Sequence, residues 1–247
     1  MKKLALLLAL LLLLMSFGCG SDLESITIGD APEFYKKSLG DGHFQIMFGM
    51  IDYAGTLADY GAGIASGSVS ITGSSGASLS DAEKDVLELA TDTLALLKNK
   101  DWGALGALVH PTQGLTFSPY GFVDTATAVK LGVGDVKALE SDDTVRVWGV
   151  FDGSGEPMEY TFAEYYDRFI MSQDFTGAPQ IGVDRIIKSG NTENNLYVLG
   201  NGVSFVEFHI PGSQPNPDHS WASLRLVFGA YENELYLVGV VHDEWTV

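Results

Sequence analysis

The chain has 247 residues, of which 46% are hydrophobic, and its 32 acidic and 14 basic residues give it a formal net charge of −18. This charge argues against a nucleic-acid partner, because proteins hold phosphate backbones through lysine and arginine. It equally disfavours spreading on anionic lipid. The chain has one cysteine, so no disulfide within the chain can support the fold, and burial of apolar side chains must hold it together.

The first 19 residues are typical of an export signal. Two lysines precede an apolar run over residues 4–15, which has the length of a secretory signal core and is shorter than the about 20 residues that a membrane-spanning helix needs. Residues 15–19 resemble the lipobox of bacterial lipoproteins, in which a small residue precedes a cysteine that is lipidated on sulfur. The resemblance implies that residues 1–18 are a signal peptide and that Cys19 is acylated. An ordinary signal peptide with an incidental cysteine is the alternative.

Acylation of Cys19 implies that the protein meets a membrane through a lipid anchor. A single acyl chain holds a protein only marginally, so several chains on one cysteine make such an anchor durable. We therefore expect an extracytoplasmic protein anchored in the cell membrane or the outer membrane. Residues 19–77 are expected to form a flexible tether, because they lack a clear period and end in a Gly/Ser-rich tract. Within them, residues 43–60 are compatible with a short helix that has Phe44, Met47, Phe48 and Ile51 on one face. This face is either a docking segment or a stripe that packs on the domain.

A folded domain is predicted over residues 78–247. Ser80 and Glu83 form a capping box, and the apolar residues that follow recur at helical spacing as far as Leu97. Asp101 is expected to cap a second, shorter helix. The sequence thus predicts that the domain opens with two helices.

Strand patterns dominate the remainder of the domain. Residues 144–151 and 157–161 flank a Gly-rich turn and predict a hairpin. A second capping box, formed by Thr161 and Glu164, predicts another helix. Three strand-like runs, which begin at Val203, Trp221 and Glu234, close the chain.

The order of these elements predicts an α+β fold rather than alternating βαβ units. The stretch LALLKNKDWGALGALVHPTQGLTFSPY resembles the opening of the nuclear transport factor two-like, cone-shaped α+β superfamily, and the terminal WASLRLVF and ELYLVGVVHDEWTV are similar to its last strands. The chain from Ser80 onward also resembles uncharacterised exported bacterial domains of that type. The resemblance implies an N-terminal helix pair packed on a curved, mainly antiparallel, cone-like sheet with a pocket at its open end. It implies no particular chemistry.

Alternation along the last three strands predicts which side chains share a face of the sheet. We expect Phe228 to lie opposite Leu235, because this register closes a wholly apolar surface. We also expect Ile210 to lie opposite Ala222, which places Glu207 directly across from Arg225. The other face then gathers five candidate ligand-binding residues: Glu207, His209, Trp221, Arg225 and His242.

These residues are compatible with two functions of different classes. The first is a non-catalytic envelope protein whose domain binds a small molecule or a protein partner. The second is a small hydrolase or isomerase that uses Glu207, His209 or His242 as acid and base. The interpretation that we favour is a solvated sheet face with a weak cross-strand ion pair. No catalytic residue is assigned, and no cofactor is expected.

No metal site is expected either. His110 has no partners at ligand spacing, and His242 and Asp243 point to opposite faces of a strand. Asp152 and Glu156 are typical of a turn, with calcium binding as the sharper alternative. The sequence contains no P-loop, no GxSxG elbow and no second cysteine.

Overall fold

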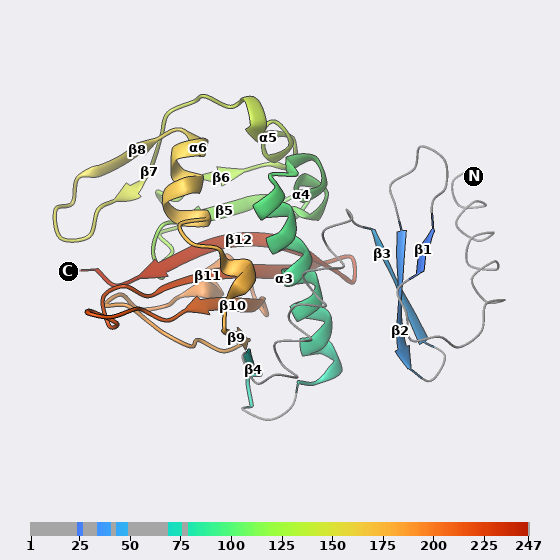
Figure 1. Cartoon of the computed structure of the whole chain (residues 1–247). Helices are drawn as coiled ribbons and strands as arrows, with labels where there is room; N and C mark the ends of the chain where they lie inside the picture. Colours follow the sequence, from blue (N-terminus) through green and yellow to red (C-terminus); the bar gives the residue numbers. More distant parts are fainter. Residues whose placement is uncertain (1–23, 27–33, 41–42, 49–68, 76–78, 247) are drawn as a thin grey trace. The chain divides into compact units, whose positions relative to one another are not determined.

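The computed structural model describes residues 24–26, 34–40, 43–48, 69–75 and 79–246. The chain divides into two compact units, Met1–Gly55 and Thr56–Val247. In the first unit, an antiparallel sheet contains β1 (Glu24–Ile26), β2 (Phe34–Gly40) and β3 (His43–Phe48), in that order (Figure 1).

The strand β3 corrects the helix that the sequence suggested over residues 43–60. Residues 43–48 pair with β2, and Phe34 lies opposite Phe48. The apolar residues of HFQIMF fit the two-residue period of a strand no worse than the period of a helix. Its aromatic and β-branched residues favour a strand. Residues 49–60, like Cys19 and the predicted signal peptide, lie outside the described residues. The stretch predicted as a tether therefore includes paired strands.

The second unit is built on a seven-stranded, mostly antiparallel sheet, so the fold is α+β as predicted. Two strand pairs are parallel, β4 (Ser70–Thr72) with β9 (Gln180–Val183) and β12 (Glu234–Glu244) with β5 (Leu115–Ser118), and the other neighbours are antiparallel. A separate antiparallel hairpin, predicted from the sequence, joins β7 (Arg146–Val150) and β8 (Pro157–Tyr160). The order of the seven strands is β4 (Ser70–Thr72), β9 (Gln180–Val183), β10 (Ser204–Ile210), β11 (Ala222–Tyr231), β12 (Glu234–Glu244), β5 (Leu115–Ser118) and β6 (Lys130–Leu131).

The helices begin at the predicted caps. The Ser80 hydroxyl accepts from the Glu83 N–H at 3.3 Å, and the Glu83 carboxylate accepts from the Ser80 N–H at 2.8 Å. Asp101 caps the next helix, and Thr161 caps a later one. The helical elements of this unit are α3 (Asp81–Asn99), α4 (Trp102–Leu108), α5 (Val133–Lys137), η1 (Leu139–Ser141), α6 (Phe162–Tyr165), the π-helical η2 (Tyr166–Ile170), η3 (Phe175–Gly177) and η4 (Leu196–Leu199).

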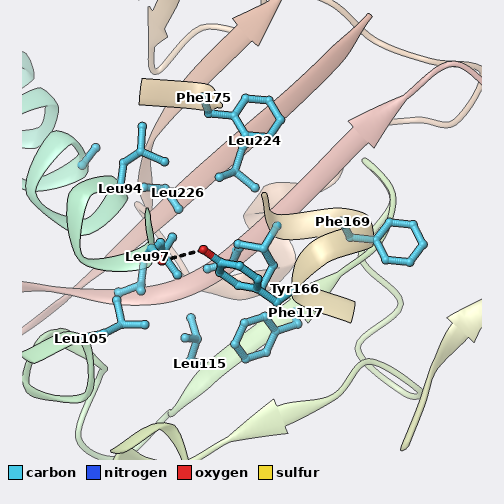
Figure 2. Packing of buried hydrophobic residues seen from close by; sticks show 14 of the residues in the cluster. Leu94, Leu97, Leu105, Leu115, Phe117, Tyr166, Phe169, Phe175, Leu224 and Leu226 are labelled. Carbon is cyan, nitrogen blue, oxygen red and sulfur yellow. Dashed lines mark hydrogen bonds between the residues drawn. The ribbon is translucent and has the colours of Figure 1, made fainter. Parts of the chain in front are cut away.

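The larger hydrophobic core lies between one face of the sheet and the helices α3 and α6–η2 (Figure 1). Figure 2 shows Leu94 and Leu97 of α3 gathered with Leu224 and Leu226 of β11. The Tyr166 hydroxyl donates to the carbonyl of Leu97 at 2.9 Å and so satisfies its own polar group inside this core. Each leucine buried in this way contributes roughly 1.5–3 kcal/mol.

A second, smaller core covers the opposite face of the sheet. Side chains alternate along a strand, so Val227 of β11 points away from the larger core that holds Leu226. Leu196 and Leu199 of η4 pack against it. The described members of this smaller core are Val123, Leu196, Leu199, Val227, Val238 and Val241. Both faces of the central strands are therefore buried.

The pairing of β11 with β12 departs from the predicted register. Phe228 lies opposite Leu237 rather than Leu235, and Val227 lies opposite Gly239, so Val238 is an extra residue in a β-bulge. A Cβ at Gly239 would lie 2.6 Å from Leu199, so glycine lets η4 approach the bulge. The bulge reverses the alternation of all later residues of β12, which simple parity cannot anticipate.

Candidate functional site

The predicted ion pair is present. Glu207 and Arg225 lie opposite each other, and Arg225 Nε donates to Glu207 Oε2 at 3.0 Å. Glu207 also accepts from the backbone N–H groups of Ile187 and Lys188 at 3.1 and 3.3 Å. Both side chains of the pair are 0% exposed. The expectation of a solvated face is therefore wrong, because the chain between β9 and β10 covers the pair.

Asp243, which strict alternation along β12 would put on the other face, is a second carboxylate beside Arg225. Arg225 Nη1 lies 2.9 Å from Asp243 Oδ2, and Nη2 donates to the carbonyl of Lys188 at 2.6 Å. Burial raises the pKa of Asp243, and the positive charge of Arg225 opposes this rise. The guanidinium thus lies among two carboxylates and a carbonyl, which compensate its removal from water.

Ser223 joins Glu207 to His209. Its hydroxyl donates to Glu207 Oε1 at 2.7 Å and lies 2.9 Å from His209 Nδ1. The hydroxyl has one hydrogen, which it gives to Glu207, so Nδ1 of His209 is the donor in the second contact. Burial lowers the pKa of His209, which keeps the imidazole neutral near pH 7. We call Glu207, His209, Ser223, Arg225 and Asp243 the buried network.

The order of groups in the buried network differs from that of a nucleophilic site. A catalytic serine gives its proton to an imidazole, which an acid holds in place. Here Ser223 lies between the acid and the imidazole and is 0% exposed. The geometry therefore supports a structural role, in which the network fixes the covering segment to the sheet.

Glycines allow the covering chain and the loop after β5 to lie this close to the sheet. A Cβ at Gly190 would lie 2.8 Å from the carbonyl of Glu244 and 3.2 Å from Asp243 Oδ1. A Cβ at Gly121 would lie 2.7 Å from Asp243 Oδ2. A larger residue at Gly190 would push the covering chain away from the sheet, and one at Gly121 would push the loop after β5 away from Asp243.

Trp221 and His242, the other two predicted site residues, lie on opposite faces of the sheet. Trp221 stays beside the buried network, with its ring centroid 5.8 Å from that of His209. His242 lies on the opposite face, where its ring centroid is 5.7 Å from that of Phe169 and 6.5 Å from that of Phe175. The prediction that His242 shares a face with Glu207 and His209 is wrong, because the bulge in β12 exchanges it for Asp243.

His110 follows α4, which ends at Leu108 with Val109 as its C-cap residue. Its Nδ1 accepts from the N–H groups of Thr112 and Gln113 at 3.3 and 3.0 Å, and its ring packs against Tyr231 and Tyr236. Among the described residues, no group of three or more His, Cys, Asp or Glu side chains is placed to hold a metal ion.

A cavity of about 470 Å³ lies elsewhere, between the loop after β5 and the β7–β8 hairpin. Its size is within the range of small-molecule sites. Phe122 and Val150 line it and are 49% and 55% exposed, so the cavity presents apolar surface to solvent. Four aromatic residues contribute to the lining: Tyr120, Phe122, Trp148 and Phe151.

The walls of this cavity are firmly held. Trp148 stacks on Tyr165 with centroids 4.0 Å apart, and its Nε1–H donates to the carbonyl of Tyr160 at 2.9 Å. The side chain of Asn195 bonds both backbone polar groups of Val123, at 2.7 and 3.0 Å. The cavity is therefore largely formed before any ligand binds.

Sequence reasoning missed this cavity, although a signal was present. The segment SPYGF places two aromatic residues, Tyr120 and Phe122, in a loop between strands rather than in a periodic element. Aromatic side chains in loops are a common feature of binding surfaces. The spatial approach of the hairpin, however, requires the fold.

No protein-family model matches this chain, and no curated protein matches it as a relative. Across the part of the chain that the structure describes, no helix has both the length and the apolar character needed to cross a membrane.

Proposed function

We propose that this protein binds a small ligand in the cavity between the loop after β5 and the β7–β8 hairpin, and that a lipid on Cys19 holds it at the cell envelope. The observation that carries the binding function is the preformed cavity of about 470 Å³ with exposed Phe122 and Val150 in its lining. Such a concave, aromatic-lined site is the usual form of a small-molecule site.

The anchor rests on the sequence. A basic start, a short apolar run and a lipobox-like Gly18–Cys19 pair support export and acylation. We accordingly place the protein outside the cytoplasm, in the cell membrane or the outer membrane. We also retain the cone-like, nuclear transport factor two-like arrangement as a proposal, which the helices packed on a mostly antiparallel sheet support.

The acid/base enzyme receives less support from the geometry. Glu207 and His209 are buried and joined through Ser223, whereas His242 lies on the other face. The residues that line the cavity include two carboxylates and no histidine, lysine or cysteine. This lining offers shape and charge for binding, and it lacks an imidazole to exchange protons near pH 7.

The binding function is tested by filling the cavity. Ala128 lines the cavity, whereas Ala126, in the same loop, is exposed and does not. We expect the neutral fluorescent dye Nile red to bind the protein, Ala128→Trp to weaken that binding at least ten-fold, and the control Ala126→Trp to leave it within two-fold. Equal binding by both variants would place the dye elsewhere and contradict the proposal.

A further inference from the structure

The lining of the cavity combines aromatic rings with negative charge. Tyr120, Phe122, Trp148 and Phe151 provide the rings, and Asp124 and Asp152 provide two carboxylates. The lining contains no lysine, arginine or histidine. The faces of aromatic rings carry negative potential and attract cations. The rings and the carboxylates therefore both favour a positively charged ligand.

Neither carboxylate is neutralised by a basic partner in the lining. Asp124 accepts from the Thr127 hydroxyl at 2.8 Å and from the Ala126 N–H at 3.0 Å. The hydrogen bond from the Thr127 side chain lowers the pKa of Asp124, so this carboxyl is ionised near pH 7. Asp152 is half-buried in the hairpin turn and accepts from the Gly153 N–H at 3.1 Å.

Two arginines on neighbouring elements are already paired: Nη2 of Arg146, in β7, lies 2.7 Å from Oδ2 of Asp142, and Arg168 pairs with Glu244. Arg168 follows α6 and stands 4.5 Å over the ring of Phe169, which is next to Tyr120. Its guanidinium donates to both carboxylate oxygens of Glu244. The negative charge of Asp124 and Asp152 is thus left for a ligand, and the acidic surface of the whole chain adds to the attraction.

We propose that this cavity selects small amphipathic organic cations, with an apolar or aromatic body and an ammonium group. The inference rests on the proposed function, because it names the ligand class of the same cavity. The cavity volume limits the ligand to the size of a small molecule, with its body against the exposed Phe122 and Val150 and its ammonium group beside the carboxylates.

The test compares three probes of similar size on the full chain: benzyltrimethylammonium, benzyl alcohol and phenylacetate, which are cationic, neutral and anionic. We expect the cation to bind at least ten-fold more tightly than the alcohol, and phenylacetate to bind most weakly. Asp124→Asn and Asp152→Asn should each weaken binding of the cation about five-fold or more, even with water-like screening, and leave the alcohol unchanged.

Two further variants separate the effect of the cavity lining from that of the overall charge of the protein. Phe122→Leu keeps the apolar contact but removes a ring face, and should reduce the preference for the cation about two- to five-fold. The control Glu234→Gln removes one charge from the exposed β11–β12 turn, away from the cavity, and should have no such effect.

The outcomes distinguish this inference from the proposed function. Binding of benzyl alcohol in the cavity without preference for the cation would overturn the inference and leave the binding function intact. An equal loss from Glu234→Gln would attribute the preference to overall charge and would also overturn it. Failure of all three probes and of Nile red to bind would contradict the proposed function itself.

Discussion

Replacing Arg225 tests how much the buried network contributes to the stability of the protein. In Arg225→Ala, Glu207 and Asp243 lose the positive charge between them, and the Lys188 carbonyl loses its donor. All three groups stay covered by the chain between β9 and β10. Breaking a buried ion pair by removing one partner costs about 3–5 kcal/mol, so we expect a loss of this size in the free energy of unfolding.

The assay is urea denaturation followed by circular dichroism. Variants are compared if the free energy of unfolding falls with urea concentration at the same slope. A matched control is Lys98→Ala, because this lysine also pairs with a carboxylate, that of Asp174, but the two side chains are 47% and 62% exposed. Its loss should be about 1 kcal/mol or less. Adding Asp243→Asn to Arg225→Ala should recover part of the stability, since it removes one stranded carboxylate. A loss at Arg225 as small as that at Lys98 would refute the reasoning.

Three other predictions concern the ends of the chain and its response to acid. A chain that starts at residue 79 should be at least about 2 kcal/mol less stable in urea than one that starts at residue 69, because it lacks β4 and the two hydrogen bonds from Ser74 to Glu83; equal stability would show that β4 is dispensable. Burial raises the pKa of Glu244, but His242 and Arg168 outweigh burial and lower it from 4.5 to about 2. The stability that this group contributes is therefore present above pH 4.5 and lost as the pH falls toward 2; Glu244→Gln should flatten that part of the stability profile, and an unchanged profile would count against the ion contacts. Mass spectrometry of the membrane fraction should find Cys19 acylated, and Cys19→Ser should release the protein; a variant that stays membrane-bound with unchanged mass would contradict the lipid anchor.

Local signals in the sequence predicted the elements that depend on neighbouring residues. The capping boxes at Ser80 and Thr161, the cap at Asp101 and the hairpin of β7 and β8 all lie where these signals place them. The β10–β11 register was also predictable, because residues 206–210 and 222–226 alternate, and pairing Ile210 with Ala222 brings their apolar residues together on one face.

Features that depend on distant segments were not predictable in this way. The bulge at Val238 depends on the fit of Leu199 against Gly239, which are 40 positions apart in the chain. The burial of Arg225 depends on a loop that supplies backbone groups rather than a side-chain motif. Parity alone therefore placed His242 on the wrong face, and polarity alone suggested a face open to solvent.

The most direct test of the central claim is an NMR titration of the isotopically labelled full chain with benzyltrimethylammonium, followed at the tryptophan indole N–H groups. Trp148 lines the cavity, and Trp221 lies beside His209 of the buried network. The account predicts that the indole signal of Trp148 and the backbone signals of residues 120–128 and 149–155 shift, whereas the signal of Trp221 does not. Shifts concentrated at Trp221 and His209, with Trp148 unchanged, would contradict it.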